Sequence, residues 1–186
     1  LAFALLRAPW SEWLADGERQ WVWFGSMALL LVVWAMKAGI TPGLSVRFLL
    51  MTALTLMHGW HLAVVAGALV LAVLSYLGMA EWSLYGPNLL CMAVVPALFT
   101  AWFHEQVHAR LPHNYFIYFF ITTFLGAALA FNLAGFVRVA LMVASGTLDA
   151  ARAGPEYFSI LPFMSFGEAI ANGTIIGMAV VYRPKW

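Results

Sequence analysis

The 186-residue chain is 64% hydrophobic and only 9% charged, with a formal net charge of +1. Soluble domains carry about 25% charged residues, so this composition argues against a water-soluble fold. A net charge this small gives no electrostatic basis for binding nucleic acid. The lone cysteine, Cys91, rules out a disulfide framework and a cysteine-based zinc site. The sequence therefore predicts an integral membrane protein in contact with the lipid bilayer.

Residues 1–20 are predicted to form an interfacial N-terminal segment, and residues 21–186 a single transmembrane helical domain. The first part mixes charged residues with Trp10 and Trp13, and tryptophan is typical of the membrane–water boundary. The chain begins at Leu1 instead of Met, so one expectation is that the sequence is truncated at its N-terminus. The first predicted span covers 21–36, and a basic loop rich in turn residues follows it.

The run 48–80 contains no Asp, Glu, Lys or Arg, yet it carries His58 and His61. A helix rises about 1.5 Å per residue and bilayer hydrocarbon is about 30 Å thick, so this run exceeds one spanning length. One tilted helix is an alternative, but the part before Gly59 is too short for a second full span. We therefore expect a helix that is broken or kinked near Gly59. The backbone polar groups at such a break must be shielded from lipid by protein or water, and this requirement indicates a functional site.

The rest of the chain alternates apolar spans with polar connections. Spans are predicted at 89–103, 115–145 and 157–182, with turns or loops at 81–88, 104–113 and 146–156. The pair Gly86-Pro87 is expected to form the corner of the first turn, and Pro96 is expected to kink the next helix. The predicted fold is an all-α integral membrane protein, a compact bundle of about five to seven transmembrane helices.

The basic residues predict an orientation in the membrane. If the run 48–80 crosses the bilayer once, one side receives Lys37, Arg47, Arg110, Arg183 and Lys185. The positive-inside rule then assigns the C-terminus to the cytoplasm and the start of the first span to the outside. We expect a multi-pass protein of a bacterial-type inner membrane.

The histidines of the long run are the leading candidates for a metal site. His58 and His61 are spaced i, i+3, which puts both on one face of a continuous helix, and Met57 is adjacent. Imidazole and thioether ligands suit cobalt, nickel, copper or zinc ions. Two imidazoles leave a site incomplete, and the candidates for a further ligand are Asn88, residues before Leu1 and water. The structural alternative is that each histidine hydrogen-bonds a neighbouring helix.

A second histidine pair lies in the segment 104–108, whose sequence is HEQVH. This spacing matches the zincin motif, in which two histidines on one helical face bind zinc and the glutamate acts as a base. The motif needs a helix and a third ligand, whereas Pro112 and its neighbours are expected to end a helix early. We therefore expect a solvated interfacial loop here, and a protein that is not an enzyme.

Polar residues also occur within the last two predicted spans. Glu168 and Asn172 are spaced i, i+4 in the final span, and Asn132 and Arg138 lie in the span before it. An unpaired carboxylate in low dielectric is costly, so Glu168 is predicted to lie inside the bundle near Arg138 or Asn132. A structural ion pair with Arg138 is the first interpretation, and a proton or cation pathway is the second.

Two short stretches resemble a known family. Residues 86–96, GPNLLCMAVVP, are similar to the pattern G-A-N-x-x-N-M-A-V-V-G-P, and 166–170, FGEAI, to a G-E-G/A segment. The chain thus resembles the CbiM/NikM group of cobalt and nickel uptake permeases, although Cys91 stands where that pattern has Asn. The resemblance implies the membrane substrate-binding component of an energy-coupling-factor transporter, an ABC transporter that works beside a coupling protein and ATPase subunits. It also implies that His58 or His61 stands for the family's histidine.

Three functions therefore compete. The leading one is a membrane-embedded permease component for the uptake of a transition-metal ion, with His58 and His61 as ligands. The second is a non-catalytic accessory subunit of a larger membrane complex, in which the histidines only hydrogen-bond. The third is a haem or quinone protein, which would need a second axial histidine on another span.

Overall fold

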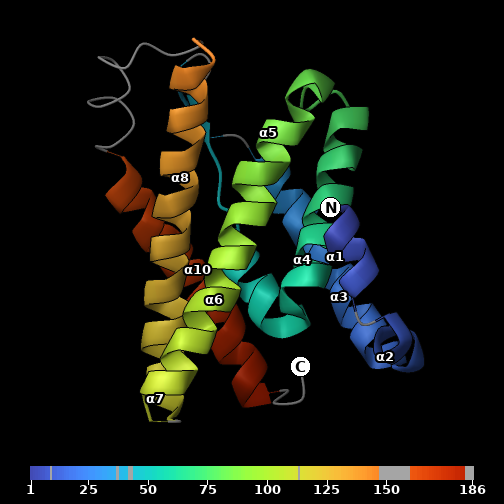
Figure 1. Ribbon diagram of the computed structural model, residues 1–186, viewed down its shortest axis with the longest axis vertical. Helices are drawn as coiled ribbons and strands as arrows, with labels where there is room; N and C mark the ends of the chain where they lie inside the picture. The colour runs from blue at the N-terminus through green and yellow to red at the C-terminus, as the bar shows by residue number, and fades with distance from the viewer. Residues whose placement is uncertain (9, 37, 42–43, 113, 147–159, 183–186) are drawn as a thin grey trace.

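The computed structural model describes residues 1–8, 10–36, 38–41, 44–112, 114–146 and 160–182. It is a bundle of long helices that run along a common axis (Figure 1). In the described residues, four helical stretches are long and apolar enough to cross a membrane: Met51–Tyr76, Trp82–Arg110, Tyr115–Ala144 and Leu161–Tyr182. The predicted all-α membrane fold is confirmed. The basic residues Lys37, Arg183 and Lys185 lie outside the described residues.

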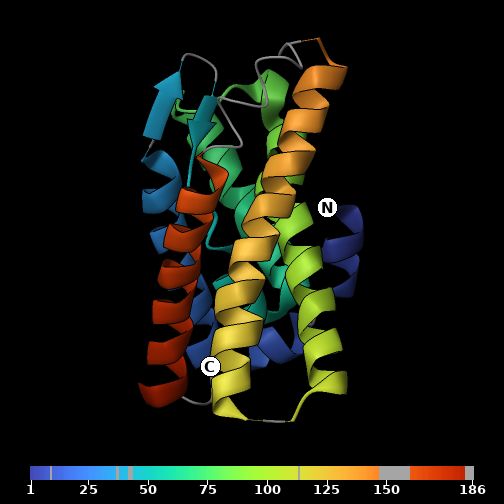
Figure 2. The same ribbon diagram turned by 90° about the vertical axis from the view of Figure 1, so that its left-hand side faces the viewer.

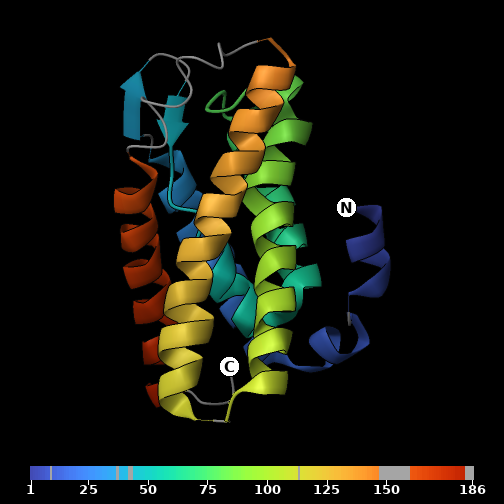
Figure 3. The same cartoon turned by 60° about the vertical axis from the view of Figure 1, so that its left-hand side comes forward.

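The N-terminal part consists of α1 (Ala2–Arg7), α2 (Trp10–Ala15) and α3 (Gly17–Ala35). The side chain of Asp16 accepts hydrogen bonds from the backbone N–H groups of Glu18 and Arg19, which caps α3. Because of this cap, α3 begins four residues before the predicted span, and it is not among the four stretches above. α1 and α2 lie on the side of the bundle away from the final helix (Figure 3).

A two-stranded antiparallel hairpin replaces the predicted loop after the first span. Its strands are β1 (Ala38–Thr41) and β2 (Leu44–Val46), with Ala38 opposite Val46. Arg47 follows at once and donates from Nη1 to the carbonyl oxygen of Trp34 at 2.8 Å, which ties the hairpin to the end of α3. Burial and the nearby charge of Arg138 both lower the pKa of Arg47.

The long apolar run forms α4 (Met51–Tyr76), and its predicted break is confirmed. Gly59 has φ 80° and ψ 154°, which is outside the helical region. The chain descends from the hairpin, reverses at this glycine and returns to the hairpin end of the bundle (Figures 1 and 2). The premise that 48–80 crosses once is therefore wrong. Arg47 and Arg110 belong to opposite ends of the bundle, because the hairpin and the end of the next long helix are far apart in Figure 2.

The next span is assembled from η1 (Trp82–Leu84), α5 (Tyr85–Leu89), the π-helical η2 (Leu90–Val94) and α6 (Val95–Arg110). The prediction of a corner at Gly86-Pro87 is wrong, because both residues lie inside α5, where a proline in the first turn loses no helical hydrogen bond. The chain turns earlier, around Gly78, whose φ is 72°. The π-helical turn Leu90–Val94 ends just before Pro96. Proline has no backbone N–H, so Pro96 cannot donate a helical hydrogen bond back into this turn.

The segment 104–108 is helical, which corrects the predicted loop. α6 continues through it and ends only at Arg110. The next span contains α7 (Tyr115–Ile117), the π-helical η3 (Tyr118–Leu125) and α8 (Gly126–Ala144), and the last described helix is α10 (Leu161–Tyr182).

α4 is at the centre of this bundle, in contact with α3, α6, α8 and α10. Small residues allow this close packing. A Cβ added to Gly67 would lie only 2.7 Å from the Cβ of Ala93 in η2.

Candidate metal site at the helix break

His58 immediately precedes the break in α4 and is held by a residue of α3. Its Nε2 lies 3.1 Å from Oγ of Ser26. The Ser26 hydroxyl already donates its single proton to the carbonyl oxygen of Val22 at 2.8 Å. With that proton on the Val22 carbonyl, Nε2 of His58 is the protonated nitrogen and donates to Ser26. This tautomer leaves the lone pair of His58 on Nδ1, where a neutral imidazole binds a cation.

His61 follows the break and is covered by the N-terminal helix. Its ring stacks on Trp60 with centroids 3.7 Å apart, and Phe3 of α1 stacks on Trp60 in turn, at 6.0 Å. Arg7 lies over the Phe3 ring, 5.2 Å from its centroid. His61 remains partly exposed between these groups.

The expectation that His58 and His61 share one helical face is wrong. The face argument requires continuous helical geometry, and Gly59 interrupts it between the two histidines. Within the described part of the chain, each ring is held by a different element: His58 by α3 and His61 beside α1. The two imidazoles are thus near each other in sequence, at one turn of the chain, but face different neighbours.

Met57 lies on the α3 side of the break. Together with Ser26, Val22 and Glu18 it lines a groove of about 590 Å³ along α3. The thioether and the serine that orients His58 therefore border the same space.

Asn88 is not brought to this place. It lies on α5, whose Tyr85 hydroxyl donates to the carbonyl oxygen of Ala68 at 2.8 Å. That contact sets α5 beside the later part of α4, about two turns beyond His61. In the described residues, no group of three or more His, Cys, Asp or Glu side chains could hold a metal ion.

A carboxylate and an amide from the last helix hold the start of α4. Oε2 of Glu168 accepts from the backbone N–H of Leu49 at 2.8 Å, and Oε1 accepts from that of Leu50 at 2.6 Å. Oδ1 of Asn172 accepts from the N–H of Ala53 at 2.7 Å. These bonds satisfy amide groups at a helix start that has no capping side chain of its own. We call Glu168 and Asn172 the α10 clamp.

The predicted location of Glu168 inside the bundle is confirmed, since only 2% of the residue is exposed. The predicted ion pair with Arg138 is wrong, because in the described residues no salt bridge joins Glu168 to Arg138 and the charge of Arg138 does not act on this carboxyl group. Asn132 does not approach Glu168 either, and donates instead to Ala128 of its own helix. Backbone N–H groups and the amide of Asn172, 2.9 Å away, satisfy the carboxylate in place of a cation.

Sequence reasoning missed Ser26 and the role of the α10 clamp. Ser26 could not be paired with His58 without knowing that α3 packs on α4. The clamp did leave a signal: the five residues directly before Met51, 46–50, include no Ser, Thr, Asp or Asn that could cap a helix, while Glu168 and Asn172 share a face of α10.

Comparison with known proteins identifies the family. A family model described as CbiM, the cobalt uptake substrate-specific transmembrane region, matches residues 6–186. No curated protein and no solved structure matches the chain. Because the family match extends over nearly the whole sequence and the fold is a bundle of membrane-spanning helices, the protein belongs to the CbiM family of cobalt-uptake transmembrane components.

Proposed function

We propose that this protein binds the transported metal ion at the break in α4, through His58 and His61 with Met57 beside them. Cobalt is the substrate that the family description names, and nickel is proposed as a second substrate because the same imidazole ligands suit it. The proposed site is incomplete in protein ligands, so water or residues outside those described complete the coordination.

The observation that carries this proposal is the hydrogen bond between His58 and Ser26. Histidines that bind metals usually donate their second ring nitrogen to a neighbouring acceptor, which fixes the tautomer and aims the ring. Ser26 acts in this way from α3, and it leaves Nδ1 of His58 for the ion. Gly59 then places His61 just past a reversal of the chain, where the imidazole is partly exposed.

We further propose that the chain works with a coupling protein and ATPase subunits in a bacterial-type inner membrane, as an energy-coupling-factor transporter. The C-terminus is proposed to be cytoplasmic. Arg110 ends α6, and the sequence after α10 contains Arg183 and Lys185; α6 and α10 end at the same end of the bundle (Figure 2). By sequence, that end has three basic residues against Lys37 and Arg47 on either side of the hairpin segment, and the proposal rests on this small excess under the positive-inside rule.

Metal binding to the tag-free chain in detergent tests the proposal. In a His108→Ala background, which disables the other histidine pair at 104–108, calorimetric titration with Co²⁺ alone should show one bound ion that is lost on adding either His58→Ala or His61→Ala. Because only neutral imidazole binds the metal, this ion should also be released when the solution is acidified enough to protonate the two rings.

The matched control is Asn132→Ala, which removes a polar side chain that bonds only within α8. This variant should keep the ion. If both histidine variants bind Co²⁺ as the parent does, the site at the helix break is wrong, and a non-catalytic accessory subunit becomes the better account.

A further inference from the structure

The histidine pair His104 and His108 lies on a helix and not in the predicted loop. α6 is continuous from Val95 to Arg110, so His104 and His108, four residues apart, are one turn apart on the same face. Their ring centroids are 5.9 Å apart. Imidazoles one turn apart on the same side of a helix are the arrangement in which two histidines bind one cation between them.

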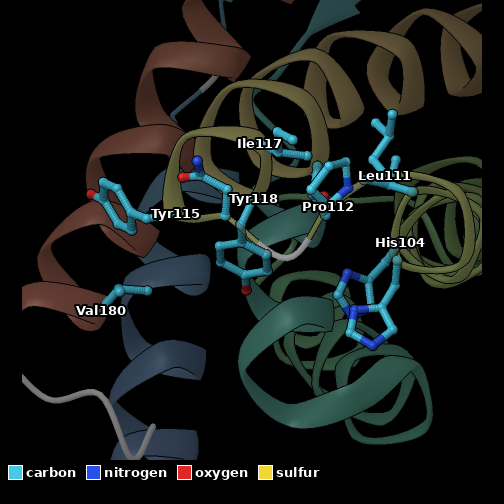
Figure 4. Close-up of a pocket in the computed structure, with 11 residues that line it drawn as sticks. His104, Leu111, Pro112, Tyr115, Ile117, Tyr118 and Val180 are labelled. Carbon is cyan, nitrogen blue, oxygen red and sulfur yellow. The ribbon is translucent and has the colours of Figure 1, made fainter.

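Both histidines line a pocket of about 480 Å³. Its other walls come from the start of the next span, with Tyr118 and Thr122, and from α10, with Val180. Figure 4 shows His104 and Tyr118 on facing sides of this pocket, with Val180 at its far end. The Tyr118 ring meets that of His104 edge-on at 6.0 Å. The pair therefore faces a partly open pocket with room for an ion and its water ligands.

One buried atom of His104, a residue that lines the pocket, is unsatisfied. Nδ1 of His104 is buried and has no hydrogen-bond partner in the described structure. Buried polar atoms almost always have a partner, and an orphaned one points to a water or an ion that belongs there. A ring nitrogen without a hydrogen bond retains the lone pair or proton that a bound ion or its water would engage.

We propose that His104 and His108 form a second binding site, for a first-row divalent transition-metal ion such as Ni²⁺, Co²⁺, Cu²⁺ or Zn²⁺. The two imidazoles are the protein ligands, and water within the pocket occupies the remaining positions. The pocket shares no lining residue with the groove at Met57, so this site is separate from the one at the helix break.

The site is not a zincin centre. Glu105 follows His104 directly, so it points about 100° around the helix from it. Glu105 is exposed and is absent from the pocket wall. The Glu105 carboxylate therefore does not face water bound between the two imidazoles. The HEQVH segment is proposed to bind a cation, but Glu105 does not act as a general base.

Ni²⁺ titration of the full, tag-free chain in detergent tests the proposal. The starting protein carries His58→Ala and His61→Ala together. This removes the proposed site at the helix break, so binding by the α6 histidines is measured alone. We expect this double variant to retain Ni²⁺ binding. Adding His108→Ala should then weaken the retained binding about tenfold or more, since loss of even an outer partner of a metal ligand costs about 10–100-fold in affinity.

His108 is the residue of choice because its side chain is exposed, so alanine there leaves the packing of α6 intact. The matched control is Glu105→Ala on the same helix, which should leave Ni²⁺ binding unchanged. The proposal is overturned if the double variant binds no Ni²⁺, or if His108→Ala and Glu105→Ala bind it equally well. Failure of the helix-break site would leave the result of this titration unaffected.

Discussion

A single serine determines how His58 can act. When Ser26 donates its hydroxyl proton to the Val22 carbonyl, it can only accept from the histidine ring, and Nδ1 is then the ring nitrogen that keeps its lone pair. The same imidazole without this bond could flip or change tautomer. At the scale of one residue, the proposed metal site therefore depends as much on α3 as on the histidines of α4.

Ser26→Ala is expected to weaken Co²⁺ binding by about tenfold to a hundredfold, because the ligand loses the partner that orients it. Ser26→Thr keeps the hydroxyl and should retain most of the affinity. Calorimetric titration of both variants beside the parent measures the difference. Equal affinities in Ser26→Ala and the parent would show that the hydrogen bond does not orient a metal ligand.

Glu168→Gln tests the α10 clamp. Both carboxylate oxygens accept backbone N–H groups, whereas glutamine offers one oxygen and turns an NH₂ group toward the other donor. A buried amide left unsatisfied costs about 1–3 kcal/mol, so thermal unfolding in detergent should shift clearly to lower temperature. The exposed Glu105→Gln is the control and should unfold as the parent does.

Thermal unfolding of Arg138→Met, alone and combined with Glu168→Gln, tests whether Glu168 also forms an ion pair with Arg138. If Glu168 and Arg138 were coupled, the double variant would be less destabilised than the sum of the single ones. We expect additive effects for this pair and a clear coupling between Glu168 and Asn172, which share a hydrogen bond of 2.9 Å. The reverse pattern would restore the ion pair.

Among the elements, α4 is the one with an unusual start and an unusual middle. Its start is held by side chains of α10 and not by its own cap, and its middle reverses at Gly59. The short first half of α4 is therefore fixed at both ends by specific interactions. Its position, and with it that of Met57 and His58, is set by its neighbours rather than by the lipid.

Gly59→Ala should destabilise the protein and weaken Co²⁺ binding together. The backbone at φ 80° and ψ 154° is accessible almost only to glycine, and forcing another residue into it costs about 1–3 kcal/mol. No atom lies within 4 Å of the added Cβ, so the loss would come from the backbone and not from a clash. Unfolding in detergent and metal titration measure both effects.

Gly86→Ala is the matched control for this substitution. Gly86 also has open space around its missing Cβ, but it lies within α5 with no positive φ. Alanine there should be neutral, or stabilising by up to about 1 kcal/mol. Equal behaviour of the two alanine variants would contradict a backbone requirement at Gly59.

The sequence predicted the elements that depend on local composition. The apolar runs identified the spans, and the length of 48–80 with a glycine inside it was enough to predict the break. The sequence did not predict that Gly86 and Pro87 are helical. Proline is as compatible with a turn as with the first turn of a helix, so the pair alone does not distinguish the two. The clamp could not be assigned, because Leu50 and its partner Glu168 are 118 residues apart.

At the scale of the whole molecule, the reversal at Gly59 sets which segments meet at each end of the bundle. The hairpin and the turn around Gly78 lie at one end, and the end of α6 lies at the other (Figure 2). A single crossing by the run 48–80 would instead have separated the hairpin from that turn. This difference makes the membrane topology testable.

Cysteine labelling in sealed membranes provides that test. In a Cys91→Ser background, Ser45→Cys in the hairpin and Ala80→Cys should react with a membrane-impermeant maleimide from the same side. Ala109→Cys, at the end of α6, should react only from the opposite side. Labelling of Ser45→Cys and Ala80→Cys from opposite sides would contradict the reversal at Gly59.

The α10 clamp also has a consequence for biosynthesis. The amide of Leu49 leaves the ribosome 119 residues before the carboxylate that binds it. At about 5–20 residues per second, the start of α4 waits about 6–24 s for its partner. Until then, its amide groups can bond only to water or to the insertion machinery, since lipid offers them nothing. Chains that stop before the last helix should thus be recognised as incomplete and degraded, even though every earlier span is already made.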